Sequence, residues 1–175
     1  MDLVSFLSYR KKSMVAKAKG GNKEAFLEII NENRANIYRV AKGILRNEED
    51  IEDAIQNTII NAYENIKTLK KDEYFKTWIT RILINECNSI FRKNKRFVVL
   101  EEEGQGNGYK DDYENIDLTR AINSLNEELK ATVVLFYFED MTTKEIADIL
   151  DVPEGTVRSR LTRARGKLRE IMGEE

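Results

Sequence analysis

The chain lacks the residues that most enzymes use for acid–base chemistry and metal binding. It has no histidine, the commonest general base and metal ligand, and one cysteine in 175 residues. It contains no C-x-x-C, H-E-x-x-H, G-x-S-x-G or P-loop sequence. We therefore expect no catalytic residue, no metal site and no cofactor. An enzyme that relies on carboxylates alone remains an alternative.

Other scarce features limit the location and the class of fold. A single cysteine excludes an internal disulfide and fits a reducing cytoplasm. No apolar run is long enough to cross a membrane, and the basic residues of segment 1–12 follow its apolar part, the reverse of a signal peptide. One proline and 34% charged residues favour helices. We expect an all-α cytoplasmic protein without membrane insertion.

The most informative stretch is residues 141–165, MTTKEIADILDVPEGTVRSRLTRAR. Thr142 and Glu145 have the S/T-x-x-E spacing of a capping box, which predicts the start of a helix. Pro153 suits the first turn of a second helix, where its missing N–H needs no partner. Two short helices joined by a turn of a few residues form the DNA-binding helix-turn-helix.

The second of these helices has a cationic surface. At about 100° per residue, one side is apolar and the opposite side carries small residues, hydroxyls and Arg163. This composition suits base edges, while the flanking cations suit phosphates. Residues 154–169 hold one acid against six Lys and Arg, whereas a merely solvated face normally mixes signs. DNA binding is therefore favoured over an exposed charged helix. The side predicted to be buried consists of Val157, Leu161, Ala164, Leu168 and Ile171.

The net charge of −2 is unusual for a DNA-binding protein. Residues 117–175 have nine basic and twelve acidic side chains, or −3, whereas residues 1–95 have eighteen against thirteen, or +5. Because electrostatic affinity for DNA grows with the number of phosphates neutralised, the chain alone should bind duplex DNA weakly. We therefore expect it to act within a larger assembly.

The pattern predicts two helical domains joined by a flexible acidic linker. Residues 101–115, EEEGQGNGYKDDYEN, have three glycines, many acids and almost no apolar side chain. The expected division is a mobile N-terminus at 1–13, a first domain at 14–96, a linker at 97–116 and a second domain at 117–173. Helices are expected from Lys23 to Leu45, from about 47 to 66, from about 74 to 95 and over 117–124. The first of them is expected to bend or divide at 31–36, and a polar loop is expected at 67–73. A further S-x-x-E box at Ser124 and Glu127 predicts the start of the next helix.

Two faces of the first domain are not explained by core packing. The helix at 47–66 has an isoleucine, Ile60, amid polar groups, and the residues alone favour a protein interface and a solvated face equally. The helix at 74–95 carries amides and arginines on one stripe with Trp78 at its edge, a combination suited to unpaired bases. A simple core position for Trp78 is equally favoured. Glu86 projects into the apolar side, which indicates a polar partner or a local distortion.

Three segments resemble the extracytoplasmic-function group of bacterial RNA polymerase sigma factors, in the sigma-70 family. DIEDAIQNT at 50–58 resembles its polymerase-binding helix, FKTWITRI at 75–82 its promoter-melting segment, and TKEIA with PEGTVRSRL and RAR at 143–165 its C-terminal helix-turn-helix. The order and spacing match over about residues 15–172. Asn57 and Ser89 depart from the family, which often has Glu and Asp there.

The resemblance implies a sigma initiation factor that is not itself an enzyme. The first domain would bind the clamp coiled coil of core RNA polymerase and open the −10 element. The second would read the −35 duplex and touch the polymerase flap. An anti-sigma factor is an expected partner, and it could hold the chain at the membrane. The implied residues are Asp50, Asp53, Gln56, Asn57 and Ile60 for polymerase; Thr77, Trp78, Arg81, Asn85 and Asn88 for −10 DNA; and Thr156, Arg158, Ser159, Arg160, Thr162 and Arg163 for −35 DNA.

Two other functions are kept as alternatives. A conventional helix-turn-helix regulator would bind an operator as a dimer without polymerase. A module that only sequesters a partner would not depend on the arginine-rich helix. The sequence does not identify the promoter, the regulon, the inducing signal or the anti-sigma factor. It also does not identify the residues of a −10 base pocket in the 65–73 loop.

Overall fold

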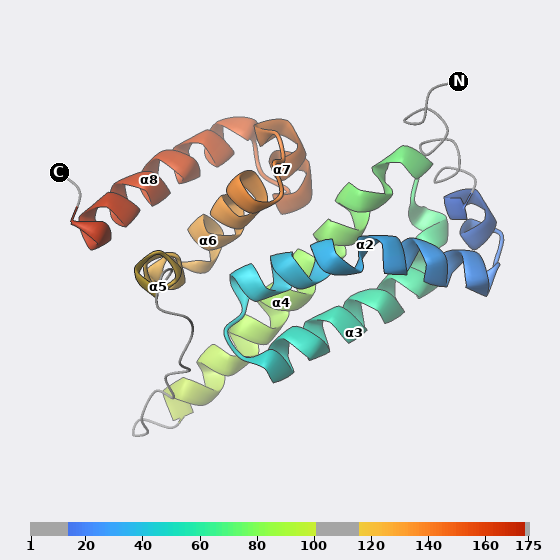
Figure 1. Ribbon diagram of the computed structural model, residues 1–175, viewed down its shortest axis with the longest axis horizontal. Helices are drawn as coiled ribbons and strands as arrows, with labels where there is room; N and C mark the ends of the chain where they lie inside the picture. The colour runs from blue at the N-terminus through green and yellow to red at the C-terminus, as the bar shows by residue number, and fades with distance from the viewer. Residues whose placement is uncertain (1–13, 101–115, 174–175) are drawn as a thin grey trace.

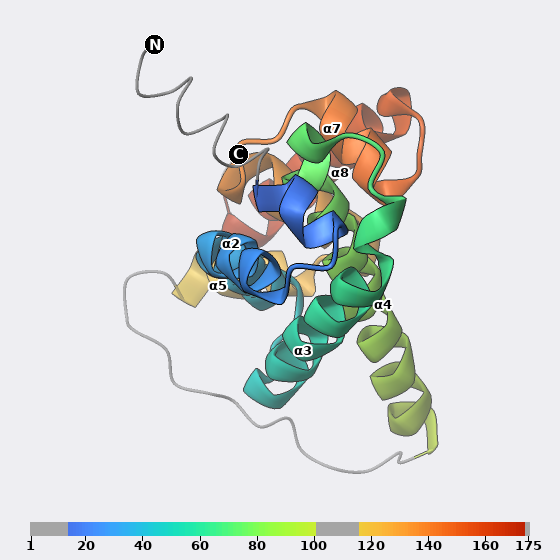
Figure 2. The same cartoon turned by 90° about the vertical axis from the view of Figure 1, so that its right-hand side faces the viewer.

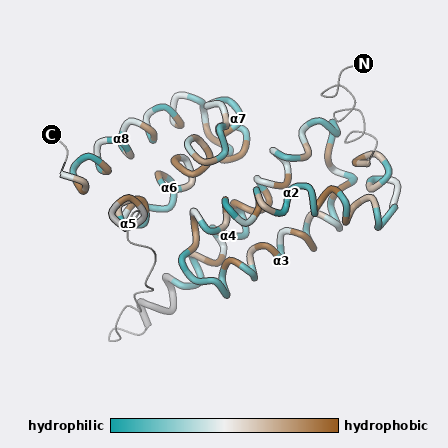
Figure 3. Tube along the Cα trace, in the orientation of Figure 1, coloured by the Kyte–Doolittle hydropathy of each residue, from teal (hydrophilic) through white to brown (hydrophobic). Residues whose placement is uncertain are grey.

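A computed structural model describes residues 14–100 and 116–173, and every regular element in these ranges is helical (Figure 1). Hydrophobic and hydrophilic stretches alternate along each helix, as expected for amphipathic helices (Figure 3). The prediction of an all-α fold is confirmed. None of the helices within these ranges is both long and apolar enough to span a membrane.

The first half of the chain is a bundle of three long helices. A helical segment at 14–19 precedes α2 (Lys23–Ile44), α3 (Glu48–Asn65) and α4 (Phe75–Leu100). Asn22 and Asn47 cap α2 and α3 by accepting hydrogen bonds from the backbone N–H of Ala25 and Glu49. The segment predicted as a polar loop contains two short 3₁₀ turns, η1 (Ile66–Thr68) and η2 (Asp72–Tyr74), with Leu69 buried.

A division of the helix at 31–36 is absent, because α2 is continuous there. Asn33 is buried, and its Nδ2 donates to the Ile29 carbonyl at 2.6 Å. The asparagine is thus satisfied inside the helix and does not break it. The third helix also runs further than expected, through Leu100, so the predicted linker at 97–116 begins as helix. Residues 101–115 of that linker and the predicted mobile N-terminus at 1–13 lie outside the described residues, and Ile116 already belongs to the next helix.

The second half contains α5 (Ile116–Ser124), α6 (Glu127–Val133), α7 (Thr143–Leu150) and α8 (Glu154–Met172). The last turns of α6 widen into a π-helix, η3 (Val134–Phe138). The capping box expected at Ser124 and Glu127 is wrong. Asn126 caps α6 by accepting from the backbone N–H of Leu129, whereas the Ser124 hydroxyl donates to the Ala121 carbonyl.

The helix-turn-helix is confirmed. The Thr142 hydroxyl accepts from the Glu145 N–H, and the Glu145 carboxylate accepts from the Thr142 N–H. The hydrogen bonds that the Glu145 carboxylate accepts from the Thr142 N–H and from the Thr142 hydroxyl lower the pKa of Glu145, since they favour its ionised form. Asp151 ends α7 in the left-handed region, at φ 55°. Pro153 then forms the N-cap of α8, one residue before the expected position.

The two halves pack against each other. One hydrophobic cluster extends from Ile29 of α2 through Ile79 of α4 to Leu135 of η3 and Ile146 of α7. α7 packs on α4, while α6 and η3 pack on α2. Figures 1 and 2 both place α7 beside the first half of α4, with α8 leading away from the three-helix bundle. The domain bounds therefore stay a prediction, because a core shared by both halves does not mark them.

Candidate nucleic-acid and protein interfaces

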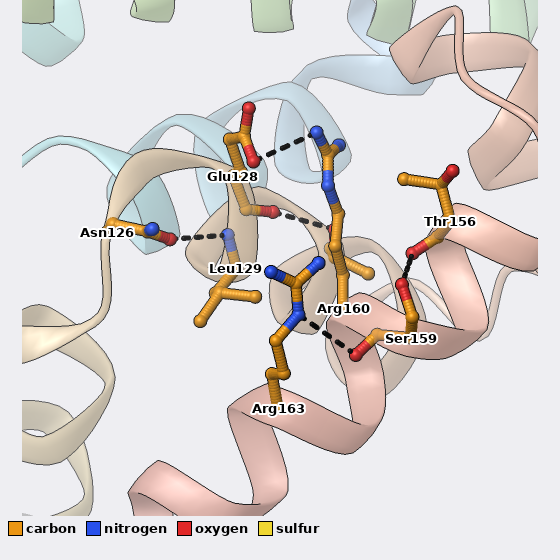
Figure 4. A network of polar contacts seen from close by, with 8 residues as sticks. Asn126, Glu128, Leu129, Thr156, Ser159, Arg160 and Arg163 are labelled. Atoms are coloured by element: carbon orange, nitrogen blue, oxygen red, sulfur yellow. Dashed lines mark hydrogen bonds and ion pairs between the residues drawn. The ribbon is translucent and has the colours of Figure 1, made fainter.

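The outer side of α8 presents the residues that the sequence assigns to base contact. Ser159, Thr162 and Arg163 are exposed, and Thr156 is half-buried. The Ser159 hydroxyl donates to the Thr156 carbonyl (Figure 4), and the Thr162 hydroxyl donates to the Arg158 carbonyl. The lone pairs of both hydroxyls therefore stay available to a ligand. The opposite side is buried at Val157, Leu161 and Ala164, as predicted, but Ile171 is 48% exposed because the helix extends past the core.

Glu154, in the first turn of α8, holds one of the flanking cations. Its carboxylate accepts from the Thr143 hydroxyl and from Arg158 Nη2, the latter at 2.8 Å. These hydrogen bonds lower the pKa of Glu154, with the Thr143 hydroxyl contributing most. Arg158 must leave this pair, or share it, to contact a phosphate.

Arg160 is arranged differently from the other arginines of α8. Its side chain is 12% exposed and lies against α6, where its Nη2 pairs with Glu128 Oε2 at 3.0 Å (Figure 4). The Arg163 side chain instead follows the surface of α8. The sequence placed Arg160 among the residues that address DNA, and the structure gives it a contact that fixes α8 to α6.

Replacing Arg160 with alanine should lower the free energy of unfolding by about 1 kcal/mol, through loss of the Glu128 pair and of buried methylenes. Replacing Arg163 with alanine should change it by less than about 0.5 kcal/mol, because that side chain is exposed. Urea denaturation followed by circular dichroism measures both. Equal effects of the two substitutions would contradict a positioning role for Arg160.

The polar face of α3 is exposed as predicted. Asp53, Gln56 and Asn57 are open to solvent, and Ile60 is 56% exposed in their midst. Asp50 is half-buried and accepts a hydrogen bond from Asn94 Nδ2 at 2.7 Å. An apolar side chain surrounded by hydrogen-bonding groups provides the composition of a protein-binding surface.

The stripe on α4 is only partly open. Arg81 and Asn85 are exposed, while Thr77, Trp78 and Asn88 are half-buried. Trp78 contacts the Phe75 ring at 5.9 Å between centroids, so it is partly a core residue and partly accessible. Glu86 accepts from Asn61 Nδ2 at 3.3 Å, which confirms the first of the two expectations for it, a polar partner.

Two buried charges were not identified from the sequence. Lys130 and Glu139 are 1% and 6% exposed, yet both occur in a hydrophobic stretch that gives no signal for their partners. Burial, with Arg46 nearby, lowers the pKa of Lys130 to about 8. The packing of the two halves brings Arg39 and Lys76 to Glu139, and the Ile44 carbonyl to Lys130, while Asn123 of the second half also accepts from Lys130.

Two family descriptions match the chain, one in each half. Residues 29–97 match the description "Sigma-70 region 2" and residues 116–168 match "Sigma-70, region 4". The first match contains the exposed face of α3 and the stripe on α4, and the second contains the helix-turn-helix.

Similar proteins cover nearly the whole chain. It is 30% identical over 151 residues to RNA polymerase sigma factor SigV of Bacillus subtilis, covering 85% of this chain and 91% of the relative. It is 28% identical to ECF RNA polymerase sigma factor SigW of the same organism, covering 91% and 95%. Among solved structures, CnrH in complex with the cytosolic domain of CnrY has a TM-score of 0.72 at 20% identity, covering 94% and 98%. RpoE of Bartonella quintana in complex with the anti-sigma factor NepR has a TM-score of 0.71 at 22% identity, and the match covers 86% of this chain and 98% of that chain. Both structures share the fold of this chain.

Proposed function

The chain belongs to the extracytoplasmic-function group of sigma factors in the sigma-70 family, and we propose that it binds core RNA polymerase and directs it to specific promoters. The observation that carries this function is the presence, on one chain, of a sigma-70 region 2 and a sigma-70 region 4. A helix-turn-helix alone would fit many regulators, whereas this pair is specific to initiation factors. The chain would supply promoter specificity without catalysis of its own, and it would act in the cytoplasm.

The −35 duplex would be read by the outer face of α8. Thr156, Ser159, Thr162 and Arg163 are the candidates for base contact, since they face away from the core of their domain. Arg158 would bind phosphate, and Arg160 would hold the helix at the required angle through Glu128.

Core polymerase would be bound by the exposed face of α3. Ile60 offers apolar area at its centre, and Asp53, Gln56 and Asn57 offer carboxylate and amide groups to a basic partner. Asp50 would take part from the edge of this face. The expected contact on the polymerase is its clamp coiled coil, with the flap as the contact of the second domain.

The −10 element would be opened by the stripe on α4. The first half of α4 offers one cation and two amides, from Arg81, Asn85 and Asn88. It begins with Phe75, so Thr77 and Trp78 lie in its first turns. Unstacking of bases costs free energy, which stacking on Trp78 and amide contacts would partly offset. Duplex reading by α8 would thus precede capture of unpaired bases by α4.

Run-off transcription with purified core polymerase tests this function. We expect core polymerase to initiate at specific sites on fragmented genomic DNA only when the chain is added. No initiation at any fragment, together with DNA binding by the chain alone as a dimer, would instead support a conventional helix-turn-helix regulator. An anti-sigma factor is a further expected partner, and RpoE of Bartonella quintana, which has the same fold, was solved in complex with the anti-sigma factor NepR.

A further inference from the structure

The arginines of α8 differ in the groups that hold them. Arg158 pairs with Glu154 at 2.8 Å, and the carboxylate offsets its charge. Arg160 pairs with Glu128 in the same way. Arg165 instead donates from its Nε to the hydroxyl of Tyr137, at 2.8 Å. A phenol is uncharged at neutral pH, so this hydrogen bond orients the guanidinium and leaves its charge for a ligand.

Tyr137 reaches α8 from outside the helix-turn-helix. It lies in η3, 28 positions before Arg165. Its ring packs edge-on against the ring of Phe136, with the centroids 5.0 Å apart. Phe136 is half-buried, whereas Tyr137 is 49% exposed. Packing of the ring therefore holds the hydroxyl at a position that is open to solvent.

The hydroxyl and the guanidinium are arranged to bind one anion together. The Tyr137 oxygen accepts from Arg165 Nε, which leaves the phenolic hydrogen available to donate. The N–H groups on the two Nη atoms of an arginine can bind two oxygens of a phosphate side by side. A phosphate at this place would meet a hydroxyl donor and a forked cation that are already in position.

This pair lies on one flank of the face of α8 that is predicted to meet base edges. At about 100° per residue, Arg158, Thr162 and Arg165 project from the same side of the helix, and all three are exposed. Arg165 is two helical turns beyond Arg158, about 10 Å along the axis. A duplex with α8 in its groove would therefore bring one of its backbones to Arg165 and Tyr137.

From this geometry we propose that Tyr137 and Arg165 form a binding site for one phosphate of the DNA backbone, which makes η3 part of the DNA-binding surface. Tyr137 positions the guanidinium through Nε and donates its own hydroxyl to the same phosphate. The site deepens the proposed reading of duplex DNA by α8 and rests on that function for its ligand. It would position α8 without selecting a sequence, because phosphates are common to all base pairs.

Fluorescence anisotropy of the full chain with short labelled duplexes of random sequence, over a series of salt concentrations, tests the site. Tyr137→Phe keeps the ring and removes the hydroxyl. We expect it to weaken binding about threefold to tenfold without changing the salt dependence, because a neutral donor displaces no counterion. Its matched control is Tyr63→Phe on α3, where the tyrosine is 44% exposed, and this variant should bind as the parent does.

Arg165→Ala should weaken binding roughly tenfold and lower the slope of log affinity against log salt by about one, since one phosphate contact is lost. Arg34→Ala removes the same charge from an exposed position on α2 and should leave the slope unchanged. When Tyr137→Phe is added to Arg165→Ala, the further loss should be less than about twofold, because the two groups bind one phosphate. Full additivity of the two losses would overturn a joint site.

Arg165→Lys tests the same site from the side of the cation. Lysine keeps the charge but has neither the Nε–H nor the fork, so the slope should be retained while binding falls about threefold or more. Binding as tight as that of the parent, in either Arg165→Lys or Tyr137→Phe, would overturn the proposal.

Circular dichroism should show the helix content of the parent in every variant. A loss of helix content in Tyr137→Phe would make the contact a structural one and would also overturn the proposal, as would a parent chain that binds no duplex at low salt. The binding measurement uses no polymerase. Failure of the run-off experiment would therefore leave its result standing, and the two proposals fail separately.

Discussion

Replacing Arg163 with alanine is expected to lower initiation roughly 10- to 100-fold at promoters that the chain selects. A side chain that contacts a base edge with two hydrogen bonds contributes about 1–3 kcal/mol of discrimination. Arg163 is exposed on the outer face of α8, and its Nε donates a long hydrogen bond of 3.5 Å to the Ser159 carbonyl. Run-off transcription with core polymerase and a fixed promoter measures the change.

The control for Arg163 is Lys167→Ala, further along the same helix and also exposed. Loss of a lysine that contacts phosphate should weaken binding about equally at all promoters. Arg163→Ala should also relax the preference for the selected promoters. Equal losses at selected and unselected promoters would remove Arg163 from the base-reading set and leave it as a phosphate contact.

Combined replacement of Asp53, Gln56 and Ile60 with alanine should weaken binding to core polymerase by roughly 30-fold or more, about 2 kcal/mol. All three side chains are exposed on α3, so the free energy of unfolding should change little. Pull-down titration with purified core polymerase gives the affinity, and urea denaturation gives the stability.

Glu52→Ala is the matched control, because Glu52 is an exposed acid on the same helix outside the predicted set. It should leave polymerase binding within about twofold of the parent chain. If the triple variant binds as tightly as the control, the polymerase-facing surface is elsewhere. Loss of binding together with loss of helix content would show that these residues support the fold instead.

Local patterns were predicted well from the sequence because their causes are local. The capping box at Thr142 and the buried side of α8 follow from spacing along one helix. Competing local signals were harder to rank. Ser124 and Asn126 both suit a helix start, and the structure selects Asn126, whose side chain reaches the N–H of Leu129.

Contacts between distant segments could not be predicted in the same way. The sequence presented the acidic linker as a boundary between independent units, yet Arg39 and Glu139 meet across 100 positions. Arg160 looked like its neighbours on α8 because its partner, Glu128, belongs to another helix. In each case a helical projection gives the direction of a side chain but not the element that it meets.

The pair between Glu154 and Arg158 affects how DNA binding responds to ionic strength. The salt dependence of a protein–DNA complex grows with the number of phosphates that its cations neutralise. Arg158 enters the complex already neutralised by a carboxylate on its own helix, at 2.8 Å. The affinity of α8 for DNA should therefore fall less steeply with salt concentration than the number of its arginines alone suggests.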